Sequence, residues 1–243
     1  MGQAPGRTLQ RGVRRDVPEV SVLRELPPLP ASAAAIVEVL APLVTPARLA
    51  RIDAIARRRT RSLVPVLEDL ADPHNGAAIL RSADAFGCHE VHVIESRHPF
   101  AVSRHVSRRT ERWIELVRHG NAADCAAALK ARGYEIFVAE MGGALTPEEL
   151  AARPRAAIVL GNEHFGASST MRAHADGTYA IPMAGMVESL NVSVASAITL
   201  YVAARHRQGD LDEDERNVIR ARLLLGQVKD AEQIVRDRLR GGV

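Results

Sequence analysis

The chain has 243 residues, 47% of them hydrophobic and 25% charged, and a formal net charge of +3 that comes mostly from arginine. This length suits one large α/β domain with appendages. No apolar run approaches the roughly 18 residues of a membrane span. The 2 cysteines lack C-x-x-C spacing, which argues against a disulfide framework or a zinc site and fits a reducing cytosol. We therefore expect a cytoplasmic protein that binds no metal.

The amino-terminal segment, residues 1–44, reads as an extension of the main fold. Its first part, MGQAPGRTLQRGVRR, lacks the apolar stretch of a secretory signal. Its Gly, Pro and Arg content favours a disordered basic arm, with a transit peptide as the alternative. The alanine-rich residues 31–40 then predict a short helix.

A clearer helix is predicted from Pro46 to about residue 59. Thr45 is a good N-cap, and proline is favoured at the first helical position. The helix ends in three consecutive arginines. They form either a solvated end that complements the helix dipole or part of a phosphate-binding surface.

From residue 63 onward, strands and helices alternate as in a parallel α/β sheet. The predicted strands are 63–67, 91–94, 113–117, 134–139, 156–160 and 178–181. The predicted helices are 75–86, 122–132, 147–152, 168–173 and 191–206. Residues 97–112 are irregular and basic, and the tail from 212 to 239 is charged and helical.

The first candidate functional motif spans residues 72–87. Asn75 stands where a helix begins, and Arg81 follows about two turns later. A capping asparagine and a surface arginine are the ordinary interpretation. However, apolar and small neighbours suggest that Arg81 is partly buried and needs a partner, and its planar fork suits a phosphate or a ribose.

The second motif, residues 158–166, is a buried strand that ends in Gly161 and is followed by the carboxylate of Glu163. Ligands of parallel α/β folds bind beyond the carboxyl ends of strands. The third motif, residues 181–200, runs from a short extended piece through a polar turn into a helix of small residues. Ser189 and Asn191 are good N-cap types for that helix, although an ordinary strand-turn-helix unit has the same pattern.

Taken together, the three motifs resemble the SpoU-related RNA ribose 2′-O-methyltransferases of the SPOUT superfamily. The matching features are Asn75 with Arg81 six residues later, Gly161-x-Glu163, and MVESLNVSVASAI at residues 186–198. The chain has no G-x-G-x-x-G fingerprint of a Rossmann enzyme. The resemblance runs from about residue 45 to residue 208.

The resemblance implies an α/β knot, with a mostly parallel sheet flanked by helices and a trefoil knot in its carboxyl half. It implies a methyltransferase domain at 45–208 with a leading basic helix, placed between the extension at 1–44 and a helical tail at 209–243. It also implies a homodimer that acts on RNA, with S-adenosylmethionine as cofactor.

Site residues carry over position by position. Motif polar residues with catalytic roles are Asn75, Arg81, Glu163, Ser189 and Asn191. The cofactor pocket, which uses mainly backbone groups, draws on Glu140, Leu160, Gly161, Ile181, Met183, Leu190 and Asn191, where Glu140 replaces the family's usual small or hydroxyl residue. The expected RNA contacts are Arg48, Arg51, Arg57, Arg58, Arg59, His74, Arg205 and Arg207.

The implied reaction moves a methyl group to a ribose 2′-hydroxyl. Arg81 is the family's usual candidate for handling that hydroxyl, but a guanidinium holds its proton so tightly that it makes a costly base, so a neighbouring phosphate is the alternative proton acceptor. The nearest branch methylates a guanosine in the tRNA D-loop. The alternatives are ribosomal RNA, another tRNA position, or a non-catalytic RNA-binding protein with a relic pocket.

Overall fold

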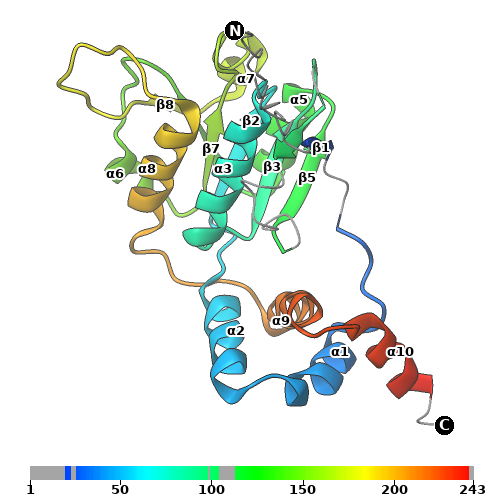
Figure 1. Cartoon of the computed structure of the whole chain (residues 1–243). Coiled ribbons are helices and arrows are strands. Elements are labelled where there is room, and N and C mark those ends of the chain that lie inside the picture. Colours follow the sequence, from blue (N-terminus) through cyan, green and yellow to red (C-terminus); the bar gives the residue numbers. More distant parts are fainter. Residues whose placement is uncertain (1–19, 23–25, 98, 104–112, 241–243) are drawn as a thin grey trace, which may run out of the picture.

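The computed structural model describes residues 20–22, 26–97, 99–103 and 113–240. Its centre is a six-stranded sheet in the order β5-β3-β2-β7-β6-β8, in which every neighbouring pair is parallel (Figure 1). The predicted parallel α/β sheet flanked by helices is therefore confirmed. The strands are β2 Leu63–Glu68, β3 Glu90–Ile94, β5 Glu115–His119, β6 Glu135–Ala139, β7 Ala156–Leu160 and β8 Gly177–Tyr179.

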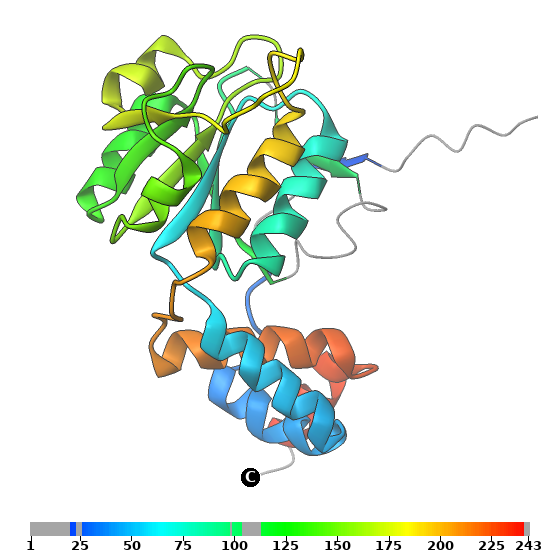
Figure 2. The same cartoon turned by 90° about the vertical axis from the view of Figure 1, so that its left-hand side faces the viewer.

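Helices cover both faces of the sheet, so the central strands are buried on both sides. On β2, the side chains of Leu63 and Leu67 join the core beneath α3 and α8, whereas Val64 and Val66 join the core beneath α5 and α7. Figure 2 shows α3 and α8 side by side on the first face. The helices are α3 Pro73–Ala85, α5 Ala122–Ala131, α6 Pro147–Ala151, α7 Ser169–His174 and α8 Val192–Ala204.

Both ends of the chain contribute to a separate helical layer below the sheet (Figure 1). Ile36, Ile52, Leu224 and Val235, one from each of four helices, are buried in its shared core. The predicted division at residues 44 and 208 cuts through this packing unit, because α2 packs against α9. The helices are α1 Ala33–Leu40, α2 Pro46–Arg58, α9 Glu213–Gln227 and α10 Ala231–Arg240, with a 3-10 turn at Ala41–Leu43.

Two of the chain's crossings between the layers touch each other: the one from α2 into β2 and the one from α8 to α9. A Cβ added to Gly209 would lie 1.8 Å from the carbonyl oxygen of Arg57, so only glycine allows this approach. The carboxylate of Asp210 accepts hydrogen bonds from the hydroxyl of Thr60 at 3.0 Å and from the backbone N–H of Arg61 at 2.7 Å. These contacts tie the entry into the sheet to the exit from it.

Some predicted boundaries were wrong, and two predictions fall outside the described residues. The strand predicted at 113–117 lies two residues later, and a small antiparallel pair of β1 Val20–Val22 with β4 Ala101–Ser103 was not predicted. The disordered arm predicted within residues 1–19 is outside the described residues, as are residues 98 and 104–112 of the irregular basic segment. In the part of the chain that is described, no helix has the length and apolar character to cross a bilayer.

Candidate active site

The three motifs meet at the end of the sheet opposite the helical layer (Figure 1). Because parallel strands end at the same edge, the loops after β2 and β7 lie together there, and the turn before α8 joins them. The connection between β6 and α6 lies against the start of the segment that leads from β8 to α8, since the N–H of Ala180 donates to the carbonyl of Leu145 at 2.9 Å.

A chain of side-chain hydrogen bonds joins one residue from each motif. The amide nitrogen of Asn75 donates to Glu163 Oε1 at 3.0 Å, and the amide nitrogen of Asn191 donates to Asn75 Oδ1 at 3.0 Å. Asn191 also caps α8, because its Oδ1 accepts from the N–H groups of Ser193 and Val194. The predicted convergence of Asn75, Glu163 and Asn191 is therefore present in the structure; their chemical roles stay predictions.

Asn75 is free to make these bonds because it is not the helix cap. The sequence predicted that α3 begins at Asn75, but the helix begins at Pro73 and the side chain of Asp72 caps it. Asn75 thus lies in the first turn and is buried, with its amide directed to the other two motifs.

Glu163 is held as a carboxylate. Burial raises its pKa, but hydrogen bonds from the side chain of Asn75 and from the backbone N–H groups of Ala71 and Asp72 outweigh that effect, so the pKa lies below the ordinary value. The two backbone donors stand 3.0 and 3.2 Å from its oxygens. Glu163 consequently binds the loop after β7 to the loop after β2.

The loop after β7 is tightly folded around Gly161. A Cβ at this position would lie 2.1 Å from the backbone nitrogen of Ala167, so a larger residue would displace the loop. Asn162 and Gly166 exchange backbone hydrogen bonds, and Gly166 has a φ of +67°, in the left-handed region that glycine favours. Position 161 therefore requires glycine for steric reasons, while its role in cofactor binding stays a prediction.

Arg81 does not fit the sequence interpretation of a partly buried arginine. It is exposed on α3, and within the described residues it makes no hydrogen bond or ion pair. Six residues of helix place it about 9 Å along the axis from Asn75. Ser189 is likewise exposed and unbonded in the described part of the chain. Both side chains are thus available to a substrate.

The predicted cofactor residues border the same loops. The backbone N–H of Glu140 donates to the carbonyl of Tyr179 at 3.0 Å, and its carboxylate pairs with Arg172 at 3.1 Å. Glu140 therefore has a structural partner, which no sequence signal revealed. Leu160 is buried, Gly161, Ile181 and Leu190 are half-buried, and Met183 is exposed.

Two of the expected RNA contacts are wrong, since they are structural arginines. Arg59 is 1% exposed, pairs with Asp84, and donates to the carbonyl of Cys88 at 2.7 Å. Arg207 is half-buried and donates to the backbone carbonyls of Ser62, Leu150, Arg153, Pro154 and Ala203. The other expected contacts, Arg48, Arg51, Arg57, Arg58, His74 and Arg205, are exposed.

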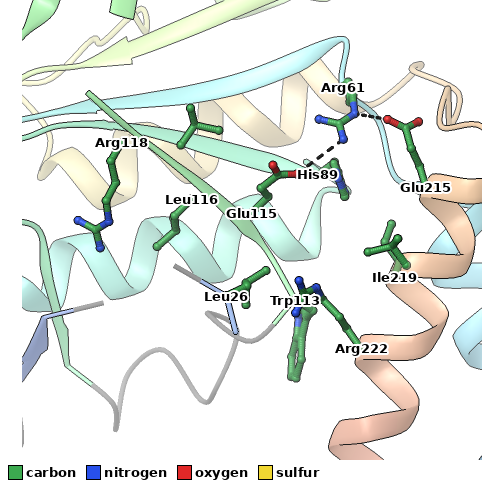
Figure 3. A pocket seen from close by; sticks show the side chains of 12 residues that line it. Leu26, Arg61, His89, Trp113, Glu115, Leu116, Arg118, Glu215, Ile219 and Arg222 are labelled. Carbon is green, nitrogen blue, oxygen red and sulfur yellow. Dashed lines mark hydrogen bonds and ion pairs between the residues drawn. The ribbon is translucent and has the colours of Figure 1, made fainter. Parts of the chain in front are cut away.

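A cavity of about 590 Å³ lies elsewhere, between the β5 edge of the sheet and α9 (Figure 3). It contains none of the predicted site residues. The guanidinium of Arg61, which lines the cavity, is already paired with the carboxylates of Glu90, Glu115 and Glu215. This cavity therefore gives no reason to move the candidate site away from the motif loops.

Comparisons with known proteins agree with the geometry of the loops. The model of the SpoU rRNA Methylase family matches residues 62–201. The tRNA (guanosine(18)-2′-O)-methyltransferase of Escherichia coli is 37% identical over 166 residues, which are 68% of this chain and 72% of that protein. The protein of the same name from Borreliella burgdorferi is 32% identical over 81% of this chain and 93% of its own length.

Solved structures show the same likeness. A TrmH/SpoU tRNA modifying enzyme of A. aeolicus has a TM-score of 0.64 at 27% identity, covering 75% of this chain and 98% of that one. The SpoU methyltransferase AviRb of Streptomyces viridochromogenes, solved with AdoMet, has a TM-score of 0.53 at 28% identity, over 60% of this chain and 58% of its own.

Proposed function

Because this chain belongs to the SpoU rRNA methylase family, it is an RNA 2′-O-methyltransferase, and we propose that it uses S-adenosylmethionine to methylate a guanosine in the tRNA D-loop. The observation that carries the proposal is the hydrogen-bonded chain of Glu163, Asn75 and Asn191. It holds three motif loops in one place, as a preorganised site requires.

The loops around the hydrogen-bonded residues Glu163, Asn75 and Asn191 have features that suit S-adenosylmethionine. From Ile181 to Leu190, no backbone N–H donates a hydrogen bond to another described residue, so these groups are available to a ligand. We propose that they and Gly161 bind the nucleoside part, with Met183 and Leu190 offering apolar contacts, while the buried Leu160 anchors Gly161 at the end of β7. When bound, the cofactor supplies an electrophilic methyl group. The carboxylate of Glu140 is paired with Arg172, which supports the proposal that this position would bind the cofactor through its backbone.

We also propose that the carboxyl half of the domain is knotted at this place. Two features support this. The strand β8 is hydrogen-bonded to β6 on one side and to the segment 143–145 on the other. In addition, a Cβ on Gly143 would lie 2.3 Å from the backbone carbon of Tyr179, so the two segments pass each other closely. A trefoil knot requires one segment to pass through a loop formed by another, and this close contact between β8 and the connection after β6 supports that arrangement.

In the proposed mechanism, Arg81 orients the ribose 2′-hydroxyl and an adjacent phosphate. Its guanidinium has no protein partner among the described residues and can donate to both groups. Because a guanidinium stays protonated and is a poor base, we assign proton acceptance to the phosphate. Glu163, Asn75 and Asn191 position the loops, and Ser189 stands in the exposed turn beside them.

Exposed arginines of the helical layer provide a surface for the RNA backbone. Arg48, Arg51, Arg57 and Arg58 lie on α2, which leads into the sheet. Phosphate contacts of this kind supply most sequence-independent affinity. The exposed His74, at the start of α3, is a further candidate contact near the site, and Arg205 follows α8.

We propose that the protein acts as a homodimer in the cytoplasm. The turn before α8 and the outer side of α8 expose large apolar side chains, which is typical of an interaction surface. Their exposed fractions are 101% for Met186, 64% for Val187, 45% for Val194, 37% for Ile198 and 54% for Tyr201. The free cysteines Cys88 and Cys125 fit a reducing compartment.

The test separates cofactor binding from turnover. Calorimetric titration with S-adenosylmethionine should show binding by the wild type and by Arg81→Ala, while methylation of tRNA should be lost in Arg81→Ala. Asn191→Ala should weaken both, because it opens the loop that holds the cofactor. A wild type that binds no S-adenosylmethionine would favour a relic pocket, and an Arg81→Ala variant with the wild-type rate would place the reacting group elsewhere.

A further inference from the structure

Away from the candidate active site, two histidines and a cysteine form a compact cluster. His92 lies in β3, His119 is the last residue of β5, and Cys125 lies in the first half of α5. One ligating atom of each lies within 4.8 Å of the ligating atoms of the other two. His92 and Cys125 are buried, and His119 is half-buried, so one side of the cluster is open to water.

The local structure fixes the cluster from three elements. Because β3 and β5 are parallel, with Ile94 opposite His119, the two rings project from neighbouring strands. They stack at 13° with centroids 5.1 Å apart, and His92 Nδ1 lies 2.9 Å from His119 Nε2. The α5 helix covers both strands and brings the sulfur of Cys125 to them.

A hydrogen-bonded histidine pair accounts for only part of this arrangement. It uses one nitrogen of each ring, whereas the sulfur of Cys125 makes no hydrogen bond to another described residue. The other nitrogen of His92 faces Glu90 Oε1 at 3.4 Å, and Glu90 is 1% exposed. A carboxylate behind a histidine is the outer partner that metal-binding histidines commonly have, because it fixes the ring and its tautomer.

We propose that His92, His119 and Cys125 bind a divalent cation of the zinc class, through His92 Nδ1, His119 Nε2 and Cys125 Sγ. Two imidazoles and a thiolate suit borderline-soft ions such as Zn²⁺. Tetrahedral coordination at bond lengths of about 2.0–2.3 Å places ligand atoms roughly 3.3–3.6 Å apart. The two histidine nitrogens would therefore separate by a few tenths of an ångström to admit the ion.

Coordination needs a definite proton balance. The thiol of Cys125 releases its proton to solvent and binds as thiolate. The proton between the two rings leaves His119 Nε2, and His119 takes the tautomer with hydrogen on Nδ1, while His92 keeps the hydrogen that faces Glu90. With three protein ligands, a water molecule completes the coordination from the open side of His119. The ion would cross-link the edge strand β5 to β3 and α5. This site departs from the expectation, drawn from cysteine spacing, that the protein binds no metal.

Cobalt is the probe, because a cysteine thiolate bound to Co²⁺ gives a near-ultraviolet charge-transfer band and tetrahedral Co²⁺ gives strong visible bands. Metal-stripped full-length protein should bind one equivalent of Co²⁺ with both features, and Zn²⁺ should displace it. Cys125→Ser should lose the thiolate band, and His119→Gln should weaken affinity at least tenfold.

Cys88→Ser is the matched control. Cys88 is the other buried cysteine, its backbone carbonyl accepts a hydrogen bond from Arg59, and it does not belong to the cluster, so this variant should keep the full spectrum. Circular dichroism shows whether each variant folds. If Cys125→Ser fails to fold, His119→Gln serves as the second variant, because His119 is only half-buried. The proposal fails if the wild type shows no thiolate band, or if the band persists in Cys125→Ser, or if Cys88→Ser alone removes it.

Discussion

Replacing Glu163 by glutamine tests the hydrogen-bonded chain that joins the motif loops. The carboxylate accepts three hydrogen bonds: Oε1 from Asn75 and Asp72, and Oε2 from Ala71. Glutamine has almost the same shape but one oxygen fewer, so its NH₂ group must face at least one of these donors. The substitution therefore removes one charge-assisted bond and weakens the others without creating a cavity.

The expected loss is about 2 kcal/mol of unfolding free energy. Hydrogen bonds to charged groups contribute roughly 1.5–3 kcal/mol each, and the half-buried position of Glu163 places its effect at the lower end. For a chain of this size, about 2–4 °C of melting temperature corresponds to each kcal/mol. At pH 7, urea denaturation should thus show a loss of about 2 kcal/mol of unfolding free energy. Thermal melts should show a melting temperature lower by roughly 4–8 °C.

The pH dependence of this loss follows from the lowered pKa of Glu163. A carboxyl group whose pKa is lower in the folded than in the unfolded protein stabilises the fold above its unfolded pKa of about 4.3. That stability disappears as the pH falls through the folded-state pKa. The difference between wild type and Glu163→Gln should therefore be constant near pH 7 and shrink below about pH 4.

Glu38→Gln is the control, because Glu38 is exposed on α1 in the helical layer and makes no ion pair with a described residue. It should leave both stability and affinity for S-adenosylmethionine unchanged, whereas Glu163→Gln should lower both. If Glu163→Gln melts and binds like Glu38→Gln, the carboxylate does not hold the loops. If the loss is the same at pH 3 as at pH 7, its cause is not the charge.

Three further substitutions address the rest of the molecule. Arg59→Ala should lower the unfolding free energy by about 3 kcal/mol in urea denaturation, because it removes the buried partner of Asp84. The control Arg58→Ala, at an exposed position, should change it by no more than about 0.5 kcal/mol. Equal values for the two variants would show that Arg59 has no special structural role. Arg57→Ala combined with Arg58→Ala should lower RNA affinity and flatten its salt dependence by about one to two in slope, and an unchanged slope would leave α2 a solvated surface. Ile198→Asp should convert the proposed dimer to a monomer in sedimentation; a variant dimer of unchanged stability would place the interface elsewhere, and a monomeric wild type would refute the dimer itself.

The sequence predicted the parts of the site that depend on strand order. Buried strands followed by Gly161 and by Asn75 had to end at one edge of a parallel sheet, so their convergence was predictable. The sequence correctly indicated Asn191 as a helix N-cap, whereas its bond to Asn75 was not predicted. The carboxylate of Glu163 was correctly expected in a loop beyond a strand end.

The parts that failed depend on partners distant in the sequence. Arg59 and Arg207 read as exposed cations because nothing near them in the chain shows the carbonyl groups that bind them in the fold. The helical layer was missed for the same reason, since α1 and α9 come from opposite ends of the chain. The cluster of His92, His119 and Cys125 has no local spacing motif and became visible only in space.

The substrate assignment is decided by mapping the methylated nucleotide. The purified protein is incubated with labelled S-adenosylmethionine and, separately, with unmodified tRNA and ribosomal RNA. We predict label on tRNA, at the ribose 2′-oxygen of a D-loop guanosine, and none with Arg81→Ala. Label on ribosomal RNA, or at another tRNA position, would contradict the proposed substrate. A methyl group on a base would contradict the reaction itself.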